Sequence, residues 1–236
     1  MAERYVVPKG WLVGLVVGLV VVLSGGESSG QTSGWESGPS AGPIGMERLI
    51  PRMDSGESYS ERYTFAAELD GGGRIKFEFT ITNYGWGDGH GAVAVKVFQP
   101  GRPAYEFSKK DDDWSYSKKR FEMTIAGTSV EAIGADRFRL THEGKVDVEV
   151  TFQNTLPMWQ PGDGQINSGD KYFTLTLIAP RADVEGWVGY GDERVEVKGS
   201  RSGLADHSAS RFAPYNLARR FGRFYHFNDD VFIAWR

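Results

Sequence analysis

The stretch Arg74-Ile-Lys-Phe-Glu-Phe-Thr-Ile-Thr82 decides the fold class, because its polar and apolar residues alternate without a break. A period of two places one set of side chains on the buried face of a β-strand and the other set in solvent. Residues 63–69 form a second apolar segment, and Asp70-Gly-Gly-Gly73 joins the two. An Asp- and Gly-rich connection of this length is typical of a β-hairpin. The stretch therefore predicts a hairpin with one buried face.

Strand-like segments continue along most of the chain, at the spacing of about 8–12 residues that is typical of antiparallel barrels and sandwiches. We expect the segment 172–178 to end at Ala179-Pro180, and we expect one short helix over residues 214–221. A last hairpin is predicted near the end of the sequence, over residues 224–227 and 231–236. The protein is therefore predicted to be all-β. The other predicted strands are 92–98, 105–107, 114–116, 120–125, 129–133, 137–142, 146–152, 186–190 and 194–198.

The composition excludes several classes of function. The chain has 236 residues with 40% hydrophobic and 13% aromatic content, which is enough to bury a substantial core. Its net charge is −4 and its basic residues are not clustered, which argues against nucleic acid as the main partner. Cysteine is absent, so disulfides, thiolate metal sites and a cysteine nucleophile are excluded.

The N-terminus predicts the compartment. Residues 11–23 are an unbroken apolar run of 13 residues, preceded by Arg4 and Lys9. A spanning helix needs roughly 17–25 residues, whereas the apolar core of a secretory signal has about 7–15. Residues 1–26 are therefore predicted to be a signal peptide that directs export to the periplasm or outside the cell, or alternatively an uncleaved anchor that tethers the protein to the membrane. Residues 27–43 are rich in Ser, Gly and Pro and predict a flexible linker.

The strongest candidate for chemistry is Asp206-His207, within the segment 199–211. Adjacent residues of a strand point to opposite faces, but Gly199 and Gly203 make a bend in the chain plausible here. In a functional interpretation Asp206 is a general acid whose pKa is raised by an apolar cavity, and His207 and Arg211 support it. In a structural interpretation the two side chains only fix a turn.

The long loop 154–169 is a second candidate, because it carries the apolar residues Met158 and Trp159 together with Asn167. These residues are expected either to cover a lipophilic ligand or to pack as a surface loop. The glycine-rich loop 83–91, which includes Trp86, lacks both the spacing and the following helix of a phosphate site. The four histidines are dispersed and the run of aspartates at 111–113 does not have calcium-loop spacing, so neither a metal nor a cofactor is predicted.

The Gly199…Asp206-His207-Ser segment, an aromatic strand after it and Asn228-Asp-Asp230 resemble the AttH/CrtC-like superfamily. That group includes carotenoid 1,2-hydratases and the yeast survival-factor proteins, and its members are tandem lipocalin-like barrels. The chain departs from the family pattern where Ala209-Ser210 replaces an aromatic-glycine pair. The resemblance implies a lipocalin-like or calycin-like barrel over residues 44–198. It also implies a junction motif and the start of a truncated second barrel over residues 199–236.

Three functions remain open at this level. The first is an exported or membrane-tethered lipocalin-like protein that binds a small hydrophobic molecule such as a lipid, an isoprenoid or a carotenoid. The second is a cofactor-independent hydratase, cyclase or isomerase, in which Asp206 is the general acid and His207, Arg211 and Tyr225 assist. The third is a β-sandwich that recognises carbohydrate or protein. The ligand contacts are expected from Trp86, Trp114, Met158, Trp159 and Asn167, and the oligomeric state stays open.

Overall fold

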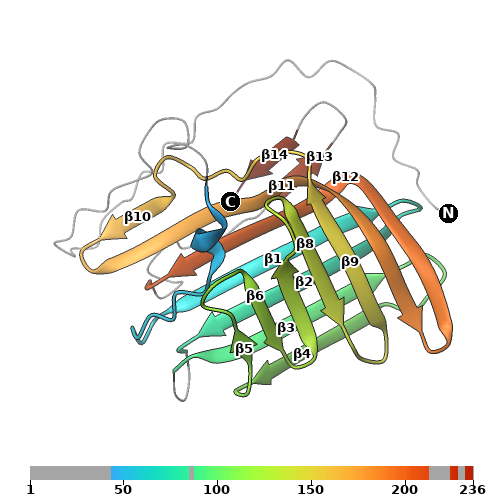
Figure 1. The fold of residues 1–236 in the computed structure, drawn as a ribbon, viewed down its shortest axis with the longest axis horizontal. Coiled ribbons are helices and arrows are strands. Elements are labelled where there is room, and N and C mark those ends of the chain that lie inside the picture. Colours follow the sequence, from blue (N-terminus) through green and yellow to red (C-terminus); the bar gives the residue numbers. More distant parts are fainter. Residues whose placement is uncertain (1–43, 85–87, 213–223, 228–231, 236) are drawn as a thin grey trace, which may run out of the picture. The chain divides into compact units, whose positions relative to one another are not determined.

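The computed structural model describes residues 44–84, 88–212, 224–227 and 232–235. In this part of the chain a 3-10 helix, η1 (Met46–Leu49), precedes a succession of antiparallel strands (Figure 1). The predicted all-β class is confirmed, and the architecture is that of a lipocalin-like barrel. The strands are β1 (Ser60–Leu69), β2 (Gly73–Thr82), β3 (His90–Phe98), β4 (Tyr105–Asp111), β5 (Ser115–Tyr116), β6 (Glu122–Ile125), β7 (Thr128–Ala132), β8 (Arg137–His142), β9 (Asp147–Asn154), β10 (Gln165–Ser168), β11 (Lys171–Tyr190), β12 (Glu193–Ser210), β13 (Phe224–Phe227) and β14 (Phe232–Trp235).

One large sheet contains β1 to β12, in the order β4-β3-β2-β1-β12-β11-β9-β8-β7-β6-β5, with β10 paired to β11. Most neighbours are also consecutive in sequence, as expected for hairpin connections. The exception that matters for function is β12, which returns to pair with β1 on one side and β11 on the other. The sheet curls, so that its two halves face each other across the interior (Figure 1). The predicted C-terminal hairpin is confirmed as the β13–β14 pair.

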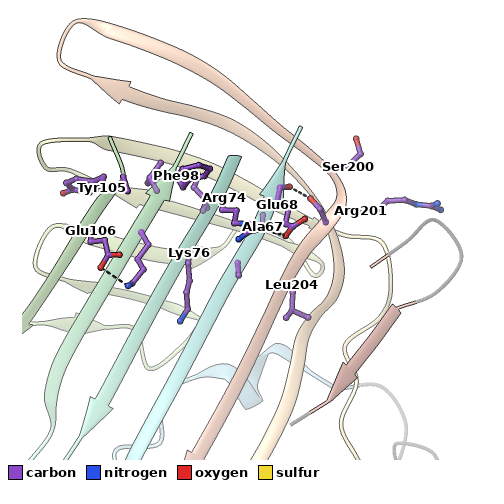
Figure 2. Close-up of a pocket in the computed structure, with 16 residues that line it drawn as sticks. Ala67, Glu68, Arg74, Lys76, Phe98, Tyr105, Glu106, Ser200, Arg201 and Leu204 are labelled. Atoms are coloured by element: carbon purple, nitrogen blue, oxygen red, sulfur yellow. Dashed lines mark hydrogen bonds and ion pairs between the residues drawn. The ribbon is translucent and has the colours of Figure 1, made fainter. Parts of the chain in front are cut away.

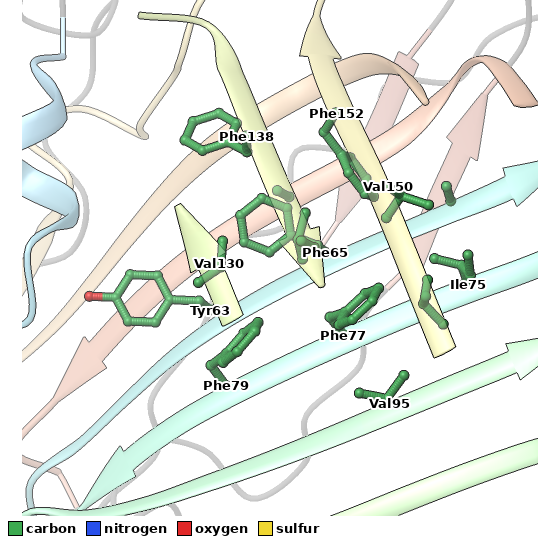
Figure 3. Close-up of a cluster of buried hydrophobic side chains, with 14 of the residues drawn as sticks. Tyr63, Phe65, Ile75, Phe77, Phe79, Val95, Val130, Phe138, Val150 and Phe152 are labelled. Atoms are coloured by element: carbon green, nitrogen blue, oxygen red, sulfur yellow. The ribbon is translucent and has the colours of Figure 1, made fainter. Parts of the chain in front are cut away.

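The core lies between the two halves of the curled sheet. Alternate residues of β2, from Ile75 to Ile81, are buried, as their period predicts. On β1, the ring of Phe65 lies 5.7 Å from that of Phe138 on β8 and 5.5 Å from that of Phe152 on β9. Figure 3 shows these side chains of β1 and β2 meeting those of β7, β8 and β9. Burial of each such ring stabilises the fold by about 1.5–3 kcal/mol.

The prediction that Ala179-Pro180 ends a strand is wrong, because β11 continues from Lys171 to Tyr190. The register between β11 and β12 shifts between Leu177 and Ala179, and again between Ala179 and Ala182. On its other side β11 begins to pair with β9 only at Ala182. Pro180 therefore lies in an irregular stretch where a missing N–H group is tolerated.

The β12 strand is irregular between Gly199 and Gly203, where its register with β11 shifts and Arg201 has a φ of 56°. Residues 203–210 pair with β1 without any shift, so no bend separates Asp206 from His207. Tyr63 of β1 lies opposite His207, and Thr64 lies opposite Asp206. Because Tyr63 belongs to the buried inner row of β1, His207 faces the interior and Asp206 faces the outer side of the sheet.

Several predicted segments lie outside the described residues, namely the signal peptide or anchor over 1–26, the linker over 27–43 and the helix over 214–221. Within the described ranges no helix has the length and apolar character needed to cross a membrane. The division between a first barrel and the start of a second one stays a prediction. Residues 199–210 themselves belong to β12 of the main sheet.

Candidate functional site

A carboxylate lies on the buried face of β1, in a row that is otherwise aromatic or aliphatic. Tyr59, Glu61, Tyr63 and Phe65 occupy alternate positions, and none of their side chains is exposed. The register of β1 with β12 brings His207, which is 3% exposed, beside this row. The chain therefore places an acid and an imidazole together inside an apolar barrel.

Glu61 is surrounded by hydrogen-bond donors. His207 Nε2 lies 2.6 Å from Glu61 Oε1, and because an ionised carboxylate has only acceptors, this nitrogen carries the proton. Glu61 Oε2 accepts hydrogen bonds from the hydroxyl of Tyr59 and from the backbone N–H of Arg52, the latter at 3.0 Å. The hydroxyl of Tyr63 lies 2.7 Å from Oε1, and its ring stacks on the imidazole of His207 at 4.3 Å.

The pKa values follow from this arrangement. Burial by itself would raise the pKa of Glu61, but the hydrogen bonds and charge of His207, with those of the two tyrosine hydroxyls, outweigh it and lower the pKa. Burial and the negative charge of Glu61 raise the pKa values of Tyr59 and Tyr63. The cluster thus holds an ionised carboxylate among protonated donors, an arrangement suited to binding a hydroxyl or carbonyl group or to moving a proton.

A separate segment closes the barrel beside this cluster. We call residues 44–56 the plug; it contains η1 and precedes β1. Leu49 of the plug is fully buried in the core, and its carbonyl oxygen lies 2.8 Å from the hydroxyl of Tyr63. Arg48 donates to the side-chain oxygen of Gln160 at 3.0 Å, which ties the plug to the loop before β10.

An ion pair ties the far end of the plug to the sheet. Arg211, at the end of β12, lies 2.7 Å from Asp54, and the hydroxyl of Tyr172 on β11 donates to the same carboxylate at 3.0 Å. Burial would raise the pKa of Asp54, but the contacts with Arg211, Gly56 and Tyr172 lower it. Next to this anchor, Met53 has a φ of 51°. A left-handed conformation at a residue other than glycine costs about 1–2 kcal/mol, so the plug stores some strain.

The predicted catalytic residues are distributed over different places. His207 belongs to the Glu61 cluster, whereas Arg211 binds Asp54 of the plug. Asp206 is 1% exposed and lies on the opposite face of β12 from His207. Tyr225 is part of β13, but its side chain lies outside the described residues. The structure therefore brings one of the four to the inner polar cluster and places Asp206 on the other side of the sheet.

The predicted ligand contacts come from separate regions. Trp114 donates to the carbonyl of Gly89 at 2.7 Å and stacks on Tyr116, at the corner between β4 and β5. Met158 packs against the core, while Trp159 is 44% exposed and its backbone pairs with that of Leu177. Asn167 of β10 accepts a hydrogen bond from the Gln165 side chain, and Trp86 lies outside the described residues.

Sequence reasoning missed Glu61 and Tyr59. The available signal was a charged residue in the apolar register of a strand, because Glu61 shares its face with Tyr63, Phe65 and Leu69. If the predicted strand had been extended from residue 63 back to residue 60, the alternation would have placed the charged Glu61 on the buried face, where charged residues are rare.

A second buried imidazole lies between two parts of the sheet. His142 of β8 is 1% exposed; its Nδ1 is 2.7 Å from the hydroxyl of Thr128, and its Nε2 is 2.9 Å from that of Tyr105 on β4. Burial lowers the pKa of His142, although the charges of Asp147 and Glu143 partly oppose the shift. This histidine links β4 to β8.

Comparison with known proteins supports the fold. No protein-family model matches the sequence, and it has no significant match among curated proteins. Among solved structures, a Nitrosomonas europaea protein provisionally named AttH is similar with a TM-score of 0.53 and 14% identity, over 69% of this chain and 56% of that one. Kievitone hydratase from Nectria haematococca has a TM-score of 0.48 and 10% identity, over 73% of this chain and 55% of that one. CghA with Sch210972 has the same TM-score and identity, over 73% and 51%.

The likeness to the AttH structure confirms the lipocalin-like fold that the Asp206-His207 segment suggested. The sequence identity of 14% is low, so this structural similarity supports the fold and does not assign an activity. The chain also spans little more than half of the length of the AttH structure.

Proposed function

We propose that the protein binds a small, largely apolar molecule at the end of the barrel that the plug closes. The observation that carries this proposal is the Glu61–His207 pair, buried in a largely apolar interior. Moving a charged group out of water costs several kcal/mol even after relaxation, and such perturbed groups cluster at functional sites. A ligand with one hydroxyl or carbonyl group, such as an oxygenated lipid, isoprenoid or carotenoid, would match this polar end and an apolar barrel.

The site would open by movement of the plug. Aromatic side chains such as Phe65, Phe77 and Phe138 fill the middle of the barrel, so a ligand would enter at the end next to Glu61. Leu49 occupies that place in the closed state: its side chain is buried in the core and its carbonyl oxygen lies beside the hydroxyl of Tyr63. The apolar part of such a ligand would replace the side chain, and its oxygen would replace the carbonyl group. The strain at Met53 favours release once the Asp54–Arg211 ion pair opens.

A titration of the full chain with the neutral fluorescent probe N-phenyl-1-naphthylamine tests the proposal. Leu49→Ala shortens the plug side chain and should increase the affinity for the probe, because an apolar cavity next to an entrance accepts apolar ligands. Leu140→Ala is the matched control, since Leu140 is equally buried but lies on β8. Equal probe binding by the two variants, or no binding by Leu49→Ala, would contradict the proposed site.

Acid–base catalysis is a second candidate, favoured by the 2.6 Å contact that orients the imidazole of His207. The reaction class would be cofactor-free hydration or isomerisation of an apolar alkene, in which His207 moves a proton and, for hydration, the elements of water add across the double bond. His207→Gln should then lower turnover of such a substrate by about 10²–10⁴-fold while probe binding persists. Asp206→Asn serves as the comparison, because Asp206 lies on the opposite face. If only Asp206→Asn lost turnover, the reaction would be assigned to Asp206 on the outer face of the sheet, and the proposed role of His207 would be wrong.

Export is part of the same proposal. The apolar run over residues 11–23 supports a signal peptide or a membrane anchor. Cell fractionation and N-terminal sequencing of the full chain distinguish the two, since a cleaved signal removes about 26 residues from the exported protein. A full-length protein in the soluble cytosolic fraction would contradict both.

A further inference from the structure

The outer face of the sheet carries a groove of about 810 Å³ over β1, β2 and β3 (Figure 2). This volume is within the roughly 300–1,000 Å³ range of small-molecule sites. One row of side chains crosses its floor: Leu204 lies opposite Ala66, Ala66 opposite Lys76, and Lys76 opposite Lys96. These residues face away from the barrel interior, so the groove is distinct from the Glu61 cluster.

The charges in the groove are unusual for a sheet surface. Lys76 and Lys96 lie directly opposite each other on adjacent strands, a position in which like charges destabilise a sheet. Lys76 pairs with Glu78, two residues further along β2, at 2.9 Å, and Lys96 pairs with Glu106 of β4 at 2.8 Å. The lining contains four cationic side chains and two carboxylates, although the whole chain has a net charge of −4. The charged side chains of the lining are Arg74, Lys76, Lys96, Arg201, Glu68 and Glu106.

Apolar surface lies next to these cations. Ala66, which is half-buried, continues the lysine row toward β12 and lies against the buried Leu204. Phe98, which is 46% exposed, lies beside Arg74 in the next row. A molecule that covers both parts would gain apolar burial and place an anionic head group beside the two half-exposed lysines. This combination matches an amphiphile with an anionic head.

The wall of the groove on the β12 side is held in place. The backbone N–H of Arg201, whose φ is 56°, donates to Asp183 at 2.7 Å, and the hydroxyl of Ser202 donates to the carbonyl of Glu68. These bonds fix the corner where β12 leaves β1. A preformed wall lowers the ordering cost of binding.

We propose that this groove binds an anionic single-chain amphiphile, with its carboxylate between Lys76 and Lys96 and its chain along Ala66 toward β12. The site takes a ligand whose head group is charged, unlike the neutral apolar molecule proposed for the barrel end. The carboxylate of a bound ligand would reduce the electrostatic repulsion between Lys76 and Lys96. The inference stands on the groove and does not depend on the function proposed for Glu61 and His207.

Isothermal titration calorimetry of the full chain with monomeric decanoate tests the proposal. We expect saturable binding that weakens with added salt and is about tenfold weaker in the double variant Lys76→Gln/Lys96→Gln, given the modest worth of half-exposed charge contacts. The matched control is Lys110→Gln/Lys118→Gln, which removes two exposed lysines outside the groove and should leave the affinity unchanged. Decanol, which lacks the charge, should bind more weakly than decanoate.

Three results would overturn the inference: no decanoate binding to the wild type, equal affinity of the wild type and the Lys76→Gln/Lys96→Gln variant, or equal affinity for decanol. A thermal melt of each variant verifies that it is folded. The Leu49→Ala variant separates this site from the barrel end. Its decanoate affinity should equal that of the wild type, and a change would place the amphiphile under the plug and refute the groove site.

Discussion

Replacing Glu61 with Gln should lower the free energy of unfolding by about 3–5 kcal/mol, the usual cost of breaking a buried ion pair from one side. The carboxylate accepts from four donors, on His207, Tyr59, Tyr63 and Arg52. An amide of the same shape keeps one accepting oxygen and turns an NH₂ group toward the remaining donors. Each buried donor left without an acceptor costs about 1–3 kcal/mol, and two such donors account for the expected loss.

Urea unfolding at pH 7, followed by tryptophan fluorescence, measures this loss as a lower midpoint with an unchanged slope. Glu57→Gln is the control, because Glu57 is exposed just before β1 and its change should stay within about 0.5 kcal/mol. A double-mutant cycle with His207→Gln isolates the pair. The double variant should be more stable than the sum of the single losses predicts, by about 0.5–3 kcal/mol.

The effect of Glu61→Gln should also depend on pH. The folded protein lowers the pKa of Glu61 below its usual value of 4.5. The stabilisation from the ionised carboxylate is therefore fully present above about pH 4.5 and is lost as the pH falls through the lowered value. The gap in stability between wild type and Glu61→Gln should narrow in acid. The usual free energy of unfolding is roughly 5–15 kcal/mol. A decrease of less than about 1 kcal/mol at pH 7 for Glu61→Gln would refute the assigned interactions. Strictly additive effects of the two single variants would refute them as well.

Three further variants test other parts of the structure. Gly186→Ala should cost about 2–3 kcal/mol in urea unfolding, because φ is 152° and a Cβ there would lie 2.0 Å from the carbonyl oxygen of Glu149; a neutral result would contradict this close approach of β9 and β11. Phe65→Ala should cost about 3–5 kcal/mol, and a loss under 1 kcal/mol would mean that Phe65 is not central to the core. His142→Gln should make the free energy of unfolding depend less on pH between pH 7 and 5. Burial lowers the pKa of His142 below its usual 6.5, so its stabilisation is complete above pH 6.5 and is lost as the pH falls through the lowered value; parallel profiles for variant and wild type would argue against this origin.

The local pattern of residues was sufficient to predict the fold class and several of the hairpins. The alternation over Arg74–Thr82 and the Asp-Gly connection before it produced the β1–β2 hairpin as predicted. The same alternation places the side chains of Asp206 and His207 on opposite faces, because both residues lie in the part of β12 that pairs regularly with β1. A local signal failed at Pro180, because the register of β11 with β12 shifts there and β11 begins to pair with β9 only at Ala182, so a residue without an N–H group is tolerated.

The candidate site depended on tertiary structure. His207 was identified in the sequence, but its partner Glu61 lies 146 residues away. Alternation tells which face of a strand a residue occupies, because that is a property of each strand alone. It does not tell which strands become neighbours or in what register. The return of β12 to pair with β1, and the closure of the barrel end by the plug, result from contacts between distant segments, and these contacts alone placed the acid beside the imidazole.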